Sequence, residues 1–379
     1  MTRTVTVPPA SLPGNSPAAA QPPGQELGVY VHFPYCLRKC PYCDFVSFAA
    51  DRGDIPHARY ADAIIAELGA KAERSAGRGD GTVFFGGGTP SLWEPAQLGR
   101  VLGALDRALP IRAGAEITME SNPSSLDAAR ARAFVAAGVN RISVGVQSLE
   151  PARLAFLGRL HDAEQGLSAV RAALTSGAER VSADLIFAVE GGAPQSPADA
   201  ALEVSRVADL RVTHLSAYGL TIEPNTAFGD LARKKRLPVA TDDVAAESFA
   251  AVERALCERG FAHYEISNYA HPGHEARHNL GYWRGRDYLG LGTGAVGTLR
   301  EDAARPGSHA VRERNVRDPD KYMRRALAGE SVAIETERLD PEARLTERIM
   351  LGLRLEEGVD LGAGPRELGI EGLTGARER

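Results

Sequence analysis

The sequence predicts an α/β fold, an incomplete (β/α)6 barrel of the TIM type followed by a smaller C-terminal α+β or helical domain. Two observations lead to this fold class. Six short apolar runs alternate with segments of helical spacing, and repeated strand–helix units imply a parallel sheet. A loop with three cysteines follows the first run, where functional groups collect in such barrels. A doubly wound sheet is the rival topology.

The expected elements follow one another in regular order. Residues 1–25 are rich in Pro, Ser, Ala and Gly without an apolar period, which predicts a disordered N-terminal extension. The expected strands are 29–33, 83–85, 116–120, 141–146, 183–189 and 214–220. Helical spacing is clearest in 60–73, 96–109, 198–209 and 242–259. We assign 26–235 to the partial barrel and 236–379 to a C-terminal domain associated with the ligand.

Composition limits the class of protein. The 379 residues carry a net charge of −5, which gives no general electrostatic argument for binding nucleic acid. No stretch approaches the roughly 18 apolar residues of a membrane span, although peripheral membrane contact stays open. The four cysteines, without a secretory signal, predict a cytoplasmic protein. We expect Cys257 to be a small buried hydrophobic residue, and the charge run at 233–236 to be a solvated helix end.

The strongest motif is the spacing Cys36-x3-Cys40-x2-Cys43 on one short loop. Three thiolates from such a loop can hold three irons of a [4Fe–4S] cluster and leave the fourth iron open for a chelating ligand. A disulfide pair and a structural zinc site are the alternatives. Zinc normally takes four ligands, and residues this close make a disulfide awkward, so the spacing favours the cluster.

Polar and glycine-rich segments follow the later strands. Three glycines at 86–88 allow close backbone approach and leave N–H groups for a charged ligand, although a plain turn explains such a run as well. Glu120, Gln147 and Asp184 stand at the ends of apolar strands, where an unpaired polar group is costly. Each therefore predicts either a bound ligand or a hydrogen bond inside the barrel.

Together these motifs resemble the radical S-adenosylmethionine (SAM) superfamily and, from about 27 to 355, the oxygen-independent coproporphyrinogen III oxidase family. The matching stretches are the cysteine loop, 86–91, 141–148 and 264–269. The resemblance implies that the open iron binds SAM. It also implies cofactor contacts from Tyr30 near the cluster, Gly87, Gly88 and Thr89 at the amino end, Glu120, Gln147, Asp184 and the carboxylate clamp Arg159 at polar groups, and Tyr218 beside the adenine.

Two branches of that family differ at readable positions. The oxidases carry a further cysteine two residues after the third cluster ligand, where this chain has Phe45, as in the HemW-type haem chaperones. The run 278–283 matches the His-Asn-x-x-Tyr-Trp motif associated with haem in that branch, which implies that His278 binds haem. A structural histidine or a zinc site with His271 and His274 are the alternatives, and His274 is a candidate second axial ligand. Pro272-Gly273 predicts a turn that argues against zinc.

The sequence therefore predicts a cytoplasmic haem chaperone with a [4Fe–4S] cluster and SAM, which delivers haem to haem-dependent respiratory proteins. The alternative is the oxidase, which decarboxylates coproporphyrinogen III by radical chemistry. Neither the haem acceptor nor the electron donor can be read from the chain. Two segments depart from the family pattern: 187–191, where the family reads x-Gly-Leu-Pro-Gly, and 294–296, where it reads Gly-Ala-His. The tail after Leu355 is short.

Overall fold

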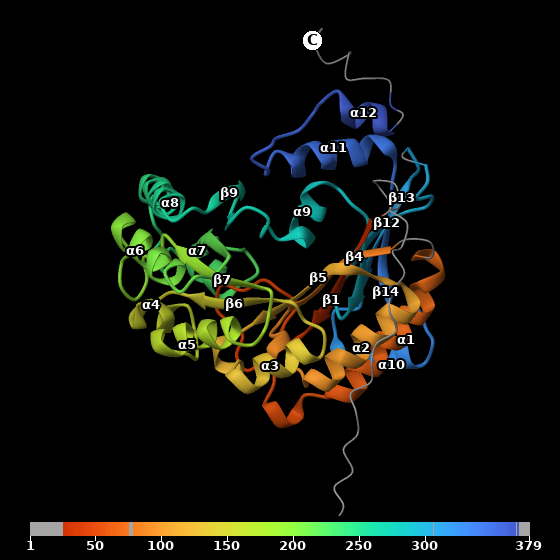
Figure 1. Cartoon of the computed structure of the whole chain (residues 1–379), viewed down its shortest axis with the longest axis horizontal. Helices are drawn as coiled ribbons and strands as arrows, with labels where there is room; N and C mark the ends of the chain where they lie inside the picture. Colours follow the sequence, from red (N-terminus) through yellow and green to blue (C-terminus); the bar gives the residue numbers. More distant parts are fainter. Residues whose placement is uncertain (1–25, 76–78, 306, 369, 371–379) are drawn as a thin grey trace, which may run out of the picture.

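The computed structural model describes residues 26–75, 79–305, 307–368 and 370, so the predicted extension 1–25 lies outside the described residues. Six parallel strands lie side by side in the order in which the chain forms them (Figure 1). They are β1 (Glu26–Phe33), β4 (Gly79–Gly87), β5 (Ile111–Ser121), β6 (Arg141–Gln147), β7 (Arg180–Phe187) and β8 (His214–Gly219). Because this order never reverses, the doubly wound alternative is wrong and the (β/α)6 arrangement is confirmed.

The connecting helices cover the outer side of this sheet. They are α1 (His57–Ser75), α2 (Pro95–Ala108), α3 (Ala128–Ala136), α4 (Pro151–Phe156), α5 (Ala163–Leu174) and α6 (Pro197–Ala208). Leu98, Val101 and Leu105 show why α2 packs as it does, since their spacing puts them on one buried face. Asp162 and Ser196 begin α5 and α6 as capping boxes, each worth about 1 kcal/mol.

Antiparallel strands extend the sheet at both edges. On one side β11 (Tyr288–Gly292) pairs parallel with β1, and β12 (Val296–Arg300), β13 (Ala310–Asn315) and β14 (Ala333–Leu339) follow antiparallel. On the other side β10 (Asn268–Ala270) pairs antiparallel with β8, and β9 (Ala262–Glu265) forms the edge. Among the described residues β14 and β9 do not pair with each other, so the barrel stays open.

The remaining elements lie around this sheet. They are β2 (Tyr35–Cys36), β3 (Phe48–Ala49), α7 (Ala227–Arg233), α8 (Asp242–Cys257), α9 (Arg277–Trp283), α10 (Pro319–Leu327), α11 (Pro341–Gly352), α12 (Ala363–Leu368) and the 3-10 turns Arg52–Asp54, Pro90–Leu92 and Pro123–Ser125. Figure 1 shows α9 and α11 on the side of the sheet opposite α1, α2 and α3. No described helix is long and apolar enough to span a membrane.

Two expectations about α7 and α8 have different outcomes. The charge run 233–236 at the end of α7 is exposed, as predicted. Cys257, by contrast, is exposed, so the expectation of a buried residue is wrong. The buried face of α8 is formed by Ser248, Ala251, Val252, Ala255 and Leu256, and the last residue of the helix turns away from it.

Candidate cofactor pocket

The cysteine loop is held over the end of β1 by backbone hydrogen bonds. The short strands β2 and β3 pair with each other, and the N–H groups of Phe48 and Ala50 donate to the carbonyls of Pro34 and Cys36. Tyr60 supports the strand end from α1, since its hydroxyl donates to the carbonyl of His32 at 2.6 Å. The loop therefore returns on itself beside the carboxyl ends of the strands.

One cavity of about 580 Å³ lies between this loop and the strand ends. It brings together most of the residues that the sequence assigned to cofactors, far apart as they are in the chain. The assigned residues that line it are Cys36, Cys40, Cys43, Gly87, Gly88, Thr89, Glu120, Gln147, Arg159, Asp184 and Tyr218. Tyr30 and His278 do not line it.

The three thiols fit an iron–sulfur cluster better than a single ion. The loop offers three free thiols, whereas a structural zinc site normally takes four ligands. Cys36 accepts a hydrogen bond from Thr89 Oγ1 at 3.3 Å, and Cys40 accepts one from Arg159 Nη1 at 3.5 Å. Burial raises the pKa of Cys36 to about 11. A thiolate in this cavity therefore needs a cationic partner, which iron ligation would supply.

The glycine run is required by close packing within the chain. Gly87 has φ of 108°, and a Cβ there would overlap the imidazole of His32. A Cβ on Gly88 would lie 2.8 Å from the carbonyl oxygen of Tyr35. The N–H groups of Gly87, Gly88 and Thr89 donate to Glu120 Oε2, Phe33 O and Tyr35 O. The expectation that these N–H groups are free for a ligand is therefore wrong in this structure.

Three charged side chains at the strand ends and after α4 line the inner part of the cavity, namely Glu120, Asp184 and Arg159. Burial, followed by the nearby Asp184, raises the pKa of Glu120 to about 7. Burial also raises the pKa of Asp184, although Ser143 Oγ donates to both of its oxygens, at 3.0 and 3.1 Å. Arg159 Nη2 donates to Gly145 O at 2.9 Å, while its Nε is buried without a hydrogen-bond partner. Such an unused donor suits a carboxylate ligand.

Strained backbone lies at two positions beside the cavity: Gln147, which the resemblance assigned to the cofactor, and Ala188, which sequence reasoning did not assign to the site. Gln147 and Ala188, at the ends of β6 and β7, have φ of 68° and 58°. Ser148 N donates to Val146 O at 2.9 Å, which closes a tight turn around Gln147. Ala188 stands where the family pattern reads Gly, and this departure was the one sequence signal of a positive φ at this position. Strain of this kind collects at functional sites, where the surroundings must hold it in place.

The far wall of the cavity is apolar. It is formed by side chains from the cysteine loop and from β7, β8, α8 and the β9–β10 turn, namely Phe45, Ile186, Phe187, Leu220, Phe249 and Ile266. Phe45 and Ile266 are 56% and 53% exposed. Apart from Phe45, sequence reasoning did not single these residues out, because tertiary structure alone brings them together.

Tyr30 and His278 lie below the cavity, inside the barrel. The hydroxyl of Tyr30 lies 3.0 Å from His32 Nδ1, and its ring stacks on Phe84. His278 stacks on the same Phe84 ring, with centroids 5.1 Å apart. Its Nδ1 and Nε2 lie 2.8 and 3.1 Å from the hydroxyls of Thr82 and Tyr282. Burial lowers the pKa of His278 to about 3. Haem ligation by His278 stays a prediction, one that requires α9 to move.

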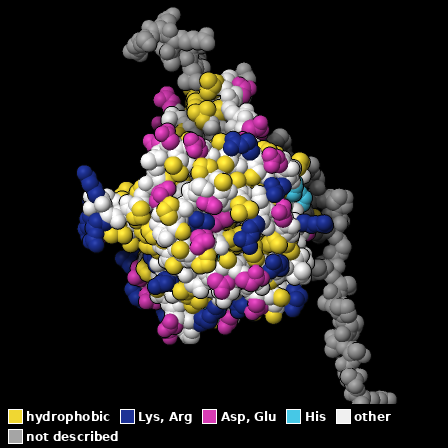
Figure 2. Space-filling model, turned by 90° about the vertical axis from the view of Figure 1, so that its left-hand side faces the viewer, with side chains coloured by type: hydrophobic (Ala, Val, Ile, Leu, Met, Phe, Trp, Pro, Cys, Tyr) yellow, Lys and Arg dark blue, Asp and Glu magenta, His cyan; other side chains and the backbone are white. Residues whose placement is uncertain are grey.

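The structure also bears on the zinc alternative at His271 and His274. Residues 272 and 273 form the predicted turn. His271 Nδ1 lies 3.0 Å from Gly260 O, and among the described residues no three His, Cys, Asp or Glu side chains form a ready metal site. The zinc alternative stays a prediction, which the observed turn disfavours. On the face shown in Figure 2, acidic, basic and hydrophobic side chains are intermixed, without the continuous basic field that a phosphate backbone favours.

The fold and the cysteine loop define a class of protein. The family model of the radical SAM superfamily matches residues 30–204. A solved structure, coproporphyrinogen III oxidase (HemN) from Escherichia coli, superposes with a TM-score of 0.74 over 93% of this chain and 80% of that chain, at 21% identity. This likeness shows a shared fold.

Sequence relatives narrow the class. The heme chaperone HemW of Escherichia coli is 39% identical over 78% of this chain and 75% of its own length. The heme chaperone HemW of Mycobacterium tuberculosis is 36% identical over 95% of this chain and 89% of its own length. This chain belongs to the radical SAM superfamily and, within it, to the HemW branch of the coproporphyrinogen III oxidase family.

Proposed function

We propose that this chain is a haem chaperone that binds a [4Fe–4S] cluster and SAM in the cavity and delivers haem to haem-dependent respiratory proteins. The observation that carries the proposal is the convergence of three cysteines, polar strand ends and an apolar wall on one cavity. Relatives over most of the chain are named heme chaperones, which supports the same function. The proposed compartment is the cytoplasm, and the haem acceptor and the electron donor are unidentified proteins.

The residues of the cavity have separate roles in this proposal. Cys36, Cys40 and Cys43 would hold the cluster, which supplies an electron to the sulfonium of SAM when both are bound. The unpaired Nε of Arg159 would bind the carboxylate of SAM. Ionised Glu120 would accept a hydrogen bond from the amino group, in addition to the one from Gly87 N. The apolar wall would exclude water from this side.

Haem has a matching surface beside these groups. Phe45, Phe249 and Ile266 offer flat or apolar faces suited to a macrocycle, next to the half-exposed ring of Tyr218. The proposed contribution of His278 needs a second arrangement of α9, because both ring nitrogens now lie against hydroxyl groups.

The second candidate is the oxidase, which the likeness to HemN favours at the level of the fold. Phe45 separates the two candidates. The oxidases of the family carry a cysteine at this position, and a phenyl ring cannot replace a thiol in proton or electron transfer. The carrier is therefore the better supported function.

Anaerobic reconstitution followed by haem titration and a coproporphyrinogen III assay tests the proposal. We expect stoichiometric haem binding and no decarboxylation in the presence of reductant and SAM. Cys36→Ala, Cys40→Ala and Cys43→Ala should each abolish the cluster absorbance, while the control Cys257→Ala should retain it, since Cys257 lies on α8. Conversion of coproporphyrinogen III by the wild-type chain would instead establish the oxidase.

A further inference from the structure

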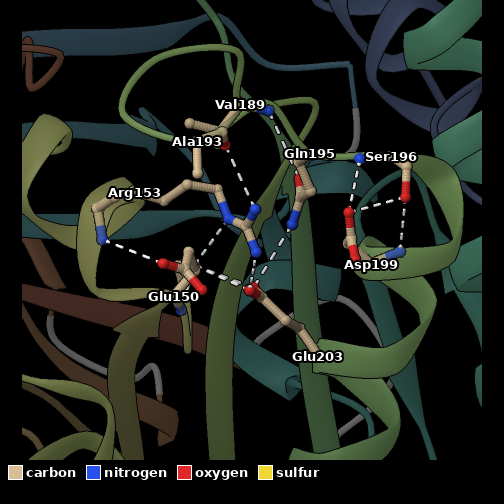
Figure 3. Close-up of polar contacts among 10 residues, drawn as sticks. Glu150, Arg153, Val189, Ala193, Gln195, Ser196, Asp199 and Glu203 are labelled. Atoms are coloured by element: carbon tan, nitrogen blue, oxygen red, sulfur yellow. Dashed lines mark hydrogen bonds and ion pairs between the residues drawn. The ribbon is translucent and has the colours of Figure 1, made fainter.

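A buried network of polar side chains lies directly behind the cavity. Arg153 on α4 and Glu203 on α6 form an ion pair of 2.5 Å, and their side chains are only 7% and 8% exposed. Figure 3 shows the guanidinium of Arg153 between the carboxylate of Glu203 and the carbonyl of Ala193. None of these side chains lines the cavity.

The network holds the turn that carries Gln147. Ser148 Oγ donates to Glu203 at 3.1 Å, and it accepts from Glu150 N and Arg153 Nε at 3.1 and 3.3 Å. Ser148 is also the residue whose N–H closes the strained turn around Gln147. Because an isolated positive φ at a non-glycine residue relaxes unless its surroundings fix it, this hydroxyl is an anchor for the cavity wall.

The same ion pair holds the loop after β7. Arg153 Nη1 donates to Ala193 O at 3.3 Å, and Gln195 Nε2 donates to Glu203 at 3.5 Å. Gln195 N in turn donates to Val189 O at 3.0 Å, next to the strained Ala188. This loop is the segment that departs from the family pattern. Its anchors therefore compensate for an alanine in a backbone conformation that suits glycine.

The anchored backbone reaches the cavity on both sides. Gln147, which is itself strained, and Phe187, which precedes the strained Ala188, both line the cavity. Arg159, which also lines it, lies in the turn that follows the end of α4 at Phe156. A shift of α4 relative to α6 would move all three groups together. Small displacements of binding groups are costly, because hydrogen bonds depend steeply on distance and angle.

We propose that Arg153 and Glu203, through Ser148 and Gln195, are positioning residues that set the shape of the SAM site, an inference that rests on the proposed SAM binding. Removing one partner alone would leave a buried charge unpaired and would test stability more than position. The informative variant is therefore the double substitution Arg153→Met/Glu203→Leu, which removes both charges and keeps the volume filled.

The test compares this double variant and Ser148→Ala with wild type and with the double variant Arg100→Met/Asp62→Leu. This control also removes both charges of an ion pair between two helices, α2 and α1, and the two side chains are 47% and 48% exposed and do not line the cavity. We expect both network variants to keep the cluster but to bind SAM roughly 10- to 100-fold more weakly by calorimetry. In the chain without cofactors, amide exchange in 188–195 should be faster than in wild type. Arg100→Met/Asp62→Leu should change neither result.

The outcomes separate this inference from the proposed function. A wild-type chain that binds SAM, together with a double variant of equal affinity and equal exchange in 188–195, would overturn the positioning role and leave the function standing. Faster exchange with weaker SAM binding in both network variants would support it. A reconstituted wild-type chain that binds no SAM would overturn the SAM site and this inference with it.

Discussion

Glu120 shows how one residue sets the electrostatics of the cavity. It stands at the end of β5, where burial, followed by the nearby carboxyl of Asp184, raises its pKa to about 7. A carboxyl group with this pKa changes its charge in the physiological range, whereas an ordinary glutamate is always ionised there. The charge available to a ligand in this cavity therefore depends on pH.

We expect SAM affinity to rise between pH 6 and pH 8, because the ionised carboxylate of Glu120 accepts a stronger hydrogen bond from the amino group of SAM than the protonated carboxyl group does. Glu120→Gln should weaken binding and remove most of this pH dependence. Calorimetric titration at several pH values measures both effects. Glu164→Gln, at a side chain that is 75% exposed, is the control and should retain the wild-type profile.

The same group has the opposite effect on folding. Its folded pKa lies above the unfolded value, so the folded chain binds the proton more tightly, and this contribution is lost as pH rises through about 7. Glu120→Gln should therefore stabilise the cofactor-free chain more at pH 8 than at pH 5, by on the order of 2 kcal/mol. Denaturant unfolding at the two pH values gives the difference, and equal effects would contradict the raised pKa.

Ala188 offers a second test at this scale. Its positive φ is unfavourable for alanine, so Ala188→Gly should stabilise the chain by about 1 kcal/mol. The same substitution in the middle of α6, Ala201→Gly, should destabilise it by about 1 kcal/mol. Unfolding curves that shift in the same direction for both variants would rule out strain at Ala188.

At the scale of elements, α9 is held inside the barrel from its first turn. The N–H groups of Arg277 and His278 donate to Glu116 of β5, at 3.2 and 3.1 Å, and a carboxylate at a helix N-terminus is favourable. Arg180 of β7 forms an ion pair with the same carboxylate at 3.2 Å. The position of α9 therefore depends on one buried acidic side chain.

Glu116→Ala should loosen α9, because it leaves two helix N–H groups without an acceptor, at a cost of about 1–3 kcal/mol. We expect faster amide exchange in 277–283. If His278 binds haem after α9 moves, haem should also associate faster with this variant, and His278→Ala should abolish the gain in the Soret band. A gain that survives His278→Ala would identify another ligand.

Sequence patterns predicted local features well and missed what long-range packing decides. Each of the six expected strands overlaps one observed parallel strand, since alternation of apolar runs and helices is a local signal. The expected ranges 183–189 and 214–220 run past the ends of β7 and β8, because the last residues of an apolar run can already belong to the following loop. The close packing at Gly87 was not predicted, because the imidazole of His32 that excludes a side chain there approaches from another strand. The contact of Gly87 with SAM stays a prediction. Phe249 on α8 and Ile266 in the β9–β10 turn could not be assigned to the cavity, because no local sequence pattern indicates that this helix and this turn lie beside the same cavity.

At the scale of the whole molecule, one continuous sheet joins both halves of the chain. Strand β11 pairs with β1, and β10 pairs with β8, so segments after residue 236 form both flanks of the predicted barrel. The division into domains at this residue stays a prediction. Limited proteolysis tests it: cleavage near 236 that releases a stable 26–235 fragment is the expected result of two independent domains.

The position of α9 inside the barrel affects how haem and an electron donor would reach the cavity. His278 of α9 stacks on Phe84, and the cysteine loop lines the cavity. Under the proposed function, the electron donor and haem would therefore approach the protein at the same cavity. A haem resting against Phe45 would cover the route by which a partner delivers electrons to the neighbouring thiolates. Haem binding and reduction of the cluster would then have to occur one after the other. A chain saturated with haem should accept electrons more slowly than a haem-free chain.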